Sequence, residues 1–192
     1  MIAIIDYGAG NTKSLQFALD RLGVKSVLTS DLNKILNADK VIFPGQGAAK
    51  SAMEKLKQQG LDKLILNLKQ PVLGICLGMQ LLCEFTEEGN IKGLGIIEGT
   101  VKRFTNEVKV PQMGWNSIHR LNGPLFDGIE AGAYMYLVHS YFVPELKETI
   151  AISNYNGAYS VALQKDNFYG VQFHPEKSSI KGQLLLNNFL KL

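Results

Sequence analysis

The first part of the chain alternates between two patterns of apolar and polar positions. Short apolar runs of strand type are separated by segments whose apolar residues recur at helical spacing. The runs predict strands at residues 2–5, 25–28 and 41–43, and the spaced segments predict helices at 12–22 and near 49–58. Strands that alternate with helices in this way favour a parallel sheet with helices on both of its faces.

From residue 93 to residue 173 the pattern changes to short strands separated by turns. We expect strands at 99–104, 116–119, 134–138, 150–154 and 159–164, which would extend the sheet in antiparallel fashion. A last amphipathic helix carries Ile180, Leu184, Leu185, Asn188 and Phe189 on the face that should pack back on the sheet. No linker, repeat or low-complexity run interrupts the chain, so residues 1–192 are expected to form a single domain.

A cysteine lies where a strand pattern turns into a helix pattern. Residues 72–75 form a buried strand pattern, and Leu77, Leu81, Leu82 and Phe85 are spaced as one helix face. Gly74 and Gly78 frame Cys76 with minimal bulk, which a sharp strand-to-helix turn requires. A helix N-terminus also favours the thiolate, the reactive form of cysteine. The alternative is a buried cysteine in an ordinary βα turn, but the glycine frame favours a nucleophile whose side chain the turn pushes outward.

A histidine and a glutamate follow a second strand pattern almost a hundred residues downstream. Tyr169, Val171 and Phe173 alternate with residues of the other strand face, which ends at His174. We expect Pro175 to keep the chain extended, so that His174 and Glu176 project in the same direction and the carboxylate orients the imidazole. With Cys76, these residues supply a nucleophile, a base and a group that orients the base. Alone, a histidine at a strand end would more often be merely solvated.

A glycine-rich loop follows the strand at 41–43 and could stabilise a developing negative charge. In Pro44-Gly45-Gln46-Gly47, backbone N–H groups can reach a ligand without obstruction by side chains. With the N–H group of Leu77, they could form an oxyanion hole, although an ordinary tight turn would explain the loop by itself. In open α/β sheets, sites form where strands end, and Gly45, Cys76 and His174 all follow strands.

Composition and charge limit where the protein can be located and what it can bind. A hydrophobic content of 46% is enough for a full core. The chain begins with a strand pattern rather than a basic or long apolar leader, so we expect a cytoplasmic location and no insertion into a membrane. The net charge of +3 is spread over helix surfaces, which does not indicate nucleic acid binding. Cys76 and Cys83 are expected two turns apart on one helix, about 10 Å by helical rise, which is too far for a disulfide. Cys83 is expected to pack in the core.

A glycine-rich turn near the N-terminus does not amount to a nucleotide site. Gly8 and Gly10 precede Lys13 and Ser14, but a phosphate-binding loop would need glycine at Tyr7 and Thr12, and the dinucleotide fingerprint would need glycine at Lys13. We therefore expect no cofactor, and no spacing in the chain predicts a metal site.

The motifs resemble those of the class I, triad-type glutamine amidotransferases. The resemblance is carried by Gly74-Ile75-Cys76-Leu77-Gly78-Met79-Gln80, Pro44-Gly45-x-Gly47 and His174-Pro175-Glu176. It narrows to the glutaminase subunits of imidazole glycerol phosphate synthase through Asp6-Tyr7-Gly8-Ala9-Gly10-Asn11, Met113-Gly114-Trp115-Asn116, Val138-His139-Ser140-Tyr141 and Pro175-Glu176-Lys177-Ser178-Ser179. It implies a flavodoxin-like α/β fold with a mostly parallel central sheet, helices on both faces and an antiparallel extension.

The resemblance also implies an activity and a set of roles. Cys76 would attack the side-chain amide of L-glutamine, His174 would protonate the departing ammonia and Glu176 would orient His174. Gln80, Ser140 and Tyr141 match residues that bind glutamine, and Gly45, Gln46, Gly47 and Leu77 match the oxyanion hole, with Gln46 where the family pattern leads us to expect valine. Ammonia would pass to a cyclase subunit of (β/α)8 barrel type in a heterodimer. By resemblance, the interface and ammonia exit would involve Asn11, Met113, Trp115, Asn116, Tyr136, His139 and Lys177.

Two other enzymes share parts of this pattern. The glutaminase subunit of pyridoxal 5'-phosphate synthase has the same triad, but is not expected to carry Gly114-Trp115-Asn116 or Lys177-Ser178-Ser179. A free-standing cysteine hydrolase would be fully active by itself. A non-enzymatic interaction module would be expected to lose a member of the triad, and none is lost here.

Overall fold

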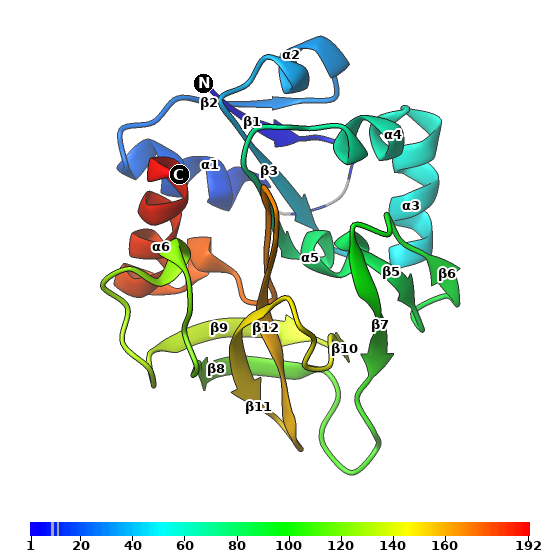
Figure 1. Cartoon of the computed structure of the whole chain (residues 1–192), viewed down its shortest axis with the longest axis vertical. Helices are drawn as coiled ribbons and strands as arrows, with labels where there is room; N and C mark the ends of the chain where they lie inside the picture. Colours follow the sequence, from blue (N-terminus) through cyan, green and yellow to red (C-terminus); the bar gives the residue numbers. More distant parts are fainter. Residues whose placement is uncertain (9, 11) are drawn as a thin grey trace.

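A seven-stranded sheet in the order β11-β12-β13-β4-β3-β1-β2 forms the centre of the protein (Figure 1). The structure is a computed structural model that describes residues 1–8, 10 and 12–192. Five neighbouring strands are parallel: β1 (Ile2–Ile5), β2 (Ser26–Thr29), β3 (Lys40–Gly45), β4 (Val72–Cys76) and β13 (Phe168–Val171). At one edge β12 (Ala158–Lys165) and β11 (Thr149–Asn154) continue the sheet in antiparallel fashion. The predicted parallel sheet with an antiparallel extension is confirmed.

Helices cover both faces of this sheet because successive strand residues point to opposite sides. In β1, Ile2 and Ile4 belong to one apolar core and Ala3 and Ile5 to the other. The first core includes residues of α1 (Thr12–Arg21) and α6 (Ser179–Lys191). The second includes residues of α2 (Leu32–Leu36), α3 (Ala49–Gln58), α4 (Leu61–Leu66) and α5 (Leu77–Leu82). Figure 1 shows α1 and α6 on one side of the sheet and α3 to α5 on the other. The short helices α2 and α4 were not predicted.

The expectation that the strands near 99–104, 116–119 and 134–138 extend the central sheet is wrong, because only those at 149–154 and 158–165 join it. The remaining short strands pair with one another instead and form two smaller sheets. The first has the order β10-β7-β5-β6 and consists of β5 (Cys83–Thr86), β6 (Ile91–Lys92), β7 (Ile97–Arg103) and β10 (Tyr141–Phe142). The second is an antiparallel pair of β8 (Gln112–Ser117) and β9 (Tyr134–His139). A 3-10 helix, η1 (Pro124–Phe126), lies between β8 and β9 in the chain. The β8–β9 pair lies beside the end of central strand β13, because the N–H group of His174, shortly after β13, donates to the carbonyl oxygen of Tyr136 in β9.

The prediction that helix α5 continues to Phe85 is wrong. The helix ends at Leu82, and both Cys83 and Phe85 lie in strand β5. The carbonyl groups of Leu81, Leu82 and Cys83 accept hydrogen bonds from the backbone N–H groups of residues 94, 96 and 95, which lie outside the helix. This pairing with a later segment ends the helix although its apolar spacing continues. Cys83 is fully buried, as expected, but it does not share a helix with Cys76.

One residue of the last helix also lies differently from the prediction. Ile180 is 78% exposed, whereas the buried residues of α6 are Gly182, Leu185, Leu186, Asn188 and Phe189. The helix packs through Gly182, where a Cβ atom would lie 2.1 Å from the carbonyl oxygen of Pro175. This contact sets the rotation of the helix and turns Ile180 toward solvent. None of the described helices is long and apolar enough to cross a lipid bilayer.

The packing of α5 against β3 gives a first prediction. A Cβ atom at Gly78 would lie 1.9 Å from the carbonyl oxygen of Phe43. Although alanine favours helix over glycine by about 1 kcal/mol, Gly78→Ala should lower the free energy of unfolding by about 3 kcal/mol or more, because backbone must move. Urea unfolding followed by circular dichroism measures the change.

The control is Gly95→Ala, at a glycine with φ +70° and no atom within 4 Å of the added Cβ. It should cost only about 1 kcal/mol, from backbone strain alone. A Gly78→Ala protein as stable as the control would contradict the close approach of α5 and β3.

Candidate active site

Cys76 occupies a sharp turn between strand β4 and helix α5. Its backbone has φ 55° and ψ −113°, a conformation that residues other than glycine rarely adopt. The turn brings the start of α5 back over β4, so that a Cβ atom at Gly74 would lie 2.9 Å from the carbonyl carbon of Gly78. The glycine frame is therefore needed for close packing, and the predicted position of Cys76 at the strand-to-helix joint is confirmed.

His174 and Glu176 form a buried hydrogen-bonded pair. Nδ1 of His174 lies 2.9 Å from Oε1 of Glu176. The expectation that Pro175 keeps the chain extended is wrong, because Pro175 begins a 3-10 helix, η2 (Pro175–Lys177). At the first position of a helix the missing N–H group of proline costs nothing. The helical turn, rather than an extended strand, brings the two side chains together.

The backbone of this turn is attached to strand β9. The N–H group of His174 donates to the carbonyl oxygen of Tyr136 over 2.9 Å. The hydroxyl group of Ser178 donates to the carbonyl oxygen of His174 over 2.6 Å and accepts from the N–H group of Tyr136 over 2.9 Å. Sequence reasoning did not find this role of Ser178, because its partner lies 42 residues away in the chain. These bonds hold the imidazole at the end of the sheet.

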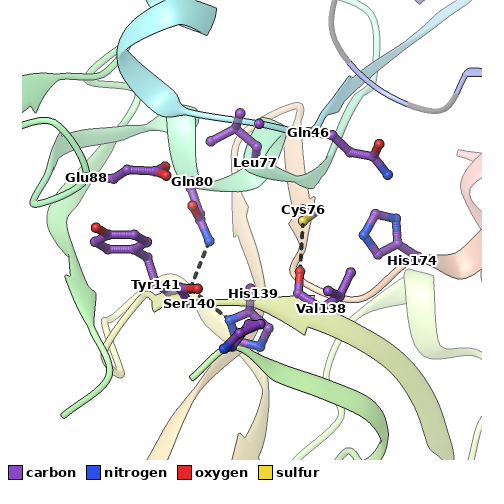
Figure 2. A pocket seen from close by; sticks show the side chains of 12 residues that line it. Gln46, Cys76, Leu77, Gln80, Glu88, Val138, His139, Ser140, Tyr141 and His174 are labelled. Carbon is purple, nitrogen blue, oxygen red and sulfur yellow. Dashed lines mark hydrogen bonds between the residues drawn. The ribbon is translucent and has the colours of Figure 1, made fainter. Parts of the chain in front are cut away.

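The electrostatic surroundings of His174 favour its charged form. Burial disfavours the positive charge, but Cys76 and Glu176 together outweigh burial and raise the pKa of His174 to about 10. Nε2 has no hydrogen-bond partner among the residues that the structure describes. Figure 2 shows the ring of His174 beside the sulfur of Cys76. A charged imidazole next to a cysteine stabilises the thiolate, so this pair can supply a nucleophile and a proton donor.

A pocket of about 410 Å³ opens over Cys76 and His174. Most of the residues predicted for the oxyanion hole and for substrate binding line it: Gln46, Gly47, Leu77, Gln80, Ser140 and Tyr141. His139, predicted for the ammonia exit, also lines it. Gly45 pairs with Cys76 in the sheet, and a Cβ atom there would lie 2.8 Å from Cβ of Leu77. The glycine-rich loop and the start of α5 thus meet at the nucleophile, as the sequence predicted.

The carbonyl oxygen of Tyr141 is held by two donors. It accepts hydrogen bonds from Nε2 of Gln80 over 2.9 Å and from Nδ1 of His139 over 2.8 Å (Figure 2). Nε2 of Gln80 also donates to Oε1 of Gln172 over 2.9 Å. The amino group of Gln80 therefore bonds to the protein itself. Gln80 lines the pocket as predicted, and it also shapes the Ser140–Tyr141 segment.

His139 is a buried, uncharged histidine in the pocket wall. It is 6% exposed, and its Nε2 lies 3.3 Å from the hydroxyl group of Tyr159. Burial lowers the pKa of His139 to about 4. Because a carbonyl oxygen only accepts, Nδ1 carries the hydrogen that bonds to Tyr141. His139 thus stays neutral at pH 7 and acts as a fixed donor.

Two further polar residues at the site were not found from the sequence. Glu88 lines the pocket, and its Oε2 accepts a hydrogen bond from the N–H group of Ala49 over 3.1 Å. Burial raises the pKa of Glu88. Gln172 is fully buried, with Nε2 at 3.7 Å from Sγ of Cys76. The turn that contains Glu88 has no sequence motif that predicts a functional residue. Gln172, by contrast, is a polar residue between the apolar residues Val171 and Phe173, and this position could have indicated a functional role.

Comparison with known proteins identifies the family. The model of the family described as glutamine amidotransferase class-I matches residues 3–192. The chain is 53% identical to imidazole glycerol phosphate synthase subunit HisH of Bacteroides fragilis, over 100% of this chain and 99% of that protein. It is 52% identical to the HisH subunit of Haemophilus influenzae, over 99% of this chain and 96% of that protein. The chain belongs to the class I glutamine amidotransferase family. The predicted resemblance is confirmed.

Solved structures with low sequence identity share the fold. A crystal structure of a glutamine amidotransferase matches with a TM-score of 0.77 at 16% identity, covering 100% of this chain and 98% of that chain. The structure of PurLQS from Thermotoga maritima matches with a TM-score of 0.73 at 16% identity, covering 99% and 97%. The α/β architecture is thus that of the class I glutamine amidotransferases.

An aromatic surface lies on the β8–β9 pair, outside the pocket. Met113 is 67% and Trp115 is 52% exposed, and Trp115 stacks edge-on against Tyr136 with ring centroids 6.2 Å apart. Nζ of Lys177 lies 6.0 Å from the centroid of the Tyr136 ring. We call Met113, Trp115, Tyr136 and Lys177 the β9 surface.

Of the other residues predicted for an interface, Asn116 follows Trp115 in β8, and its amide bonds to the carbonyl oxygen of Asn154 over 3.0 Å. His139 lies in the pocket wall and is buried. Asn11 lies outside the described residues. Within residues 1–8, 10 and 12–192, no three histidine, cysteine, aspartate or glutamate side chains gather in a way that could hold a metal ion.

The buried, neutral state of His139 predicts a pH effect on stability. Histidine has a pKa near 6.5 in an unfolded chain, and that of folded His139 is about 4. The contribution of neutral His139 to the free energy of unfolding is complete above pH 6.5. It is lost as the pH falls toward 4, because over this interval only the unfolded chain takes up the proton. The loss should reach up to about 3 kcal/mol. Urea unfolding between pH 7 and pH 4 measures it.

The His139→Gln protein should lose less stability than the unaltered protein over this interval. His119→Gln serves as the control, since His119 is exposed, and its pH dependence should match that of the unaltered protein. Equal pH slopes for all three proteins would contradict a neutral, buried His139.

Proposed function

We propose that this chain is the glutaminase subunit of imidazole glycerol phosphate synthase. It hydrolyses L-glutamine to glutamate and ammonia, and passes the ammonia to a cyclase subunit of (β/α)8 barrel type in a cytoplasmic heterodimer. The observation that carries the proposal is the strained turn at Cys76 beside the His174–Glu176 pair in one pocket. Full-length similarity to HisH subunits supports the assignment of the partner.

The triad divides the reaction into two steps. The thiolate of Cys76 attacks the side-chain amide carbon of glutamine, and His174 protonates the departing ammonia, which leaves a thioester. A water molecule then attacks the thioester, with His174 as the base, and glutamate and free Cys76 are released. Glu176 bonds to Nδ1 of His174, so that Nε2 is the nitrogen available to the reacting groups.

Backbone groups beside Cys76 stabilise the tetrahedral intermediates. The N–H groups of Leu77 and of the loop at Gly45, Gln46 and Gly47 are the candidate donors to the oxyanion, each contributing about 3 kcal/mol to the transition state. Gly47 has φ +92°, which glycine adopts without strain. A peptide flip in this loop could therefore present or withdraw a donor at low cost.

Polar groups at the far end of the pocket suit the amino-acid end of glutamine. The carboxylate of Glu88 complements the α-ammonium group, and Ser140 and Tyr141 offer backbone groups to the α-carboxylate. Gln80 and His139 fix the carbonyl oxygen of Tyr141 and so hold this segment in place. Glutamine then lies with its side-chain amide toward Cys76.

The β9 surface provides the cyclase interface and the ammonia exit. The carbonyl oxygen of Val138 lies 3.9 Å from Sγ of Cys76, so strand β9 connects the nucleophile to half-buried Tyr136, which pairs with exposed Trp115 of β8. No described acidic group forms an ion pair with Lys177, which leaves it available for a carboxylate of the cyclase. Asn11 and Asn116 complete the proposed contact.

Replacing the nucleophile should separate the two halves of the reaction. Cys76→Ala should abolish glutamine hydrolysis, because no thioester can form, while the complex with cyclase still uses added ammonium salt. Cys83→Ala is the matched control: it removes the buried cysteine of the core and should retain activity, with a loss of stability below about 2 kcal/mol. Glutamate release and ammonia-dependent turnover are both measured. Hydrolysis by a pure Cys76→Ala protein would refute the nucleophile.

The partner should switch on hydrolysis. If one oxyanion donor is withdrawn in the free subunit, about 3 kcal/mol is missing and the rate falls a hundredfold or more. Steady-state glutaminase rates are measured with this chain alone, with cyclase, and with cyclase plus its ribotide ligand. We expect the rate to rise to its full value in the third mixture. Equal rates in all three would instead identify a free-standing cysteine hydrolase.

A further inference from the structure

Gln172 is a buried polar residue that the proposed mechanism does not use. It directly follows strand β13, is 0% exposed, and lies between Val171 and Phe173, which are equally buried. A side-chain amide offers two donor hydrogens and an acceptor oxygen, and burial without partners would be costly. The partners of this amide therefore indicate why glutamine occupies the position.

Both polar atoms of the Gln172 amide form hydrogen bonds at the site. Nε2 of Gln172 donates to Sγ of Cys76 over 3.7 Å, and Oε1 accepts from Nε2 of Gln80 over 2.9 Å. The sulfur itself lies within hydrogen-bond distance of the carbonyl oxygen of Val138, at 3.9 Å. That carbonyl oxygen favours the thiol, which can donate a hydrogen to it, and repels the negative charge of a thiolate. The amide N–H group of Gln172 donates to the sulfur and therefore favours the thiolate over the thiol.

The orientation of the amide is determined by a chain of hydrogen bonds. The carbonyl oxygen of Tyr141 only accepts, so the amino group of Gln80 must face it. The second hydrogen of this amino group then bonds to Oε1 of Gln172. The amino group of Gln172 is thereby turned toward Cys76. A backbone carbonyl in the substrate pocket thus decides which end of Gln172 meets the sulfur.

We propose that Gln172 is a positioning residue for the nucleophile, whose amide N–H group fixes Sγ of Cys76 and stabilises its thiolate. The inference rests on the proposed function only in taking Cys76 as the nucleophile. It adds a direct connection between the Tyr141 segment and the sulfur, through Gln80 and Gln172. Through these hydrogen bonds, a change in the position of Tyr141 would alter the contact between Gln172 and the thiolate.

Several titratable groups surround the sulfur and affect any pH measurement. His174 lies beside it in the turn after β13, with Glu176 bonded to the far side of the imidazole. Tyr7, which follows β1 and donates to the carbonyl oxygen of Pro44, interacts electrostatically with Cys76. Glu88 and His139 line other walls of the pocket. The effect of Gln172 must therefore be measured as a difference between proteins that share all of these groups.

The test follows alkylation of Cys76 by iodoacetamide against pH in a Cys83→Ala background. Gln172→Met keeps the length of the side chain but removes both the donor to Sγ and the acceptor for Gln80. The midpoint of alkylation should rise by about one pH unit, as expected for the loss of one hydrogen bond to an anion. The value of kcat/KM for glutamine should fall about tenfold, mainly through kcat. Gln164→Met is the matched control, since Gln164 bonds to Tyr169 and not to the site. It should change neither value.

Two further measurements guard against a variant that does not fold. Gln172→Glu keeps the acceptor for Gln80 and loses the donor to the sulfur, so its midpoint should also rise. In the unaltered protein, the side-chain amide resonances of Gln172 should titrate with the midpoint of Cys76 alkylation. An unchanged midpoint in a folded variant, or amide resonances that do not titrate, would overturn the inference. Alkylation needs no glutamine, so this outcome is distinct from a failure of the proposed function.

Discussion

The close approach of helix α5 to strand β3 is the constraint on which the site depends. The carbonyl oxygen of Phe43 lies so near Gly78 that no side chain fits at that position. The same packing turns the chain so sharply after β4 that Cys76 is held at φ 55°. Strain of this kind persists only where the surrounding structure fixes it, and it is common at functional sites. The nucleophile is therefore held by backbone packing on both sides.

The parallel pairing of three strands brings the other parts of the site to the same edge. Gly45 of β3 lies opposite Cys76 of β4, and Val171 of β13 lies opposite Ile75. Three segments that are far apart in the chain thus end side by side. The histidine then needs only a short turn, which Ser178 attaches to β9, to reach the thiol. The edge of the sheet defines where the site lies, and the hydrogen bonds of β9 define its details.

Two histidines in one pocket have opposite electrostatic states. His174 lies beside Cys76 and Glu176, which favour its positive charge despite burial. His139 has a backbone carbonyl and a tyrosine hydroxyl as its partners, and burial keeps it neutral. The difference comes from their neighbours rather than from their exposure, since both are buried. One histidine can therefore exchange protons during catalysis while the other remains a fixed part of the pocket wall.

Local sequence determined the features that depend on near neighbours. The apolar spacing gave the first strands and helices, and the glycine frame of Cys76 gave the nucleophile turn, because both reflect steric limits within a few residues. The pair of His174 and Glu176 was also predicted, although by way of an extended chain that the structure replaces with a 3-10 turn.

Only the tertiary structure decided features whose partners are distant in sequence. Helix α5 ends before Phe85 because the N–H groups of residues 94 and 96 bond to its last two carbonyl groups, and Ile180 is exposed because Gly182 sets the rotation of α6. The same holds for Glu88 and for Gln172, which is 96 residues from Cys76 in the chain and touches it in space. A hydrogen bond between side chains leaves no periodic pattern in the sequence, so the polar part of the pocket became visible only when the strands were assembled.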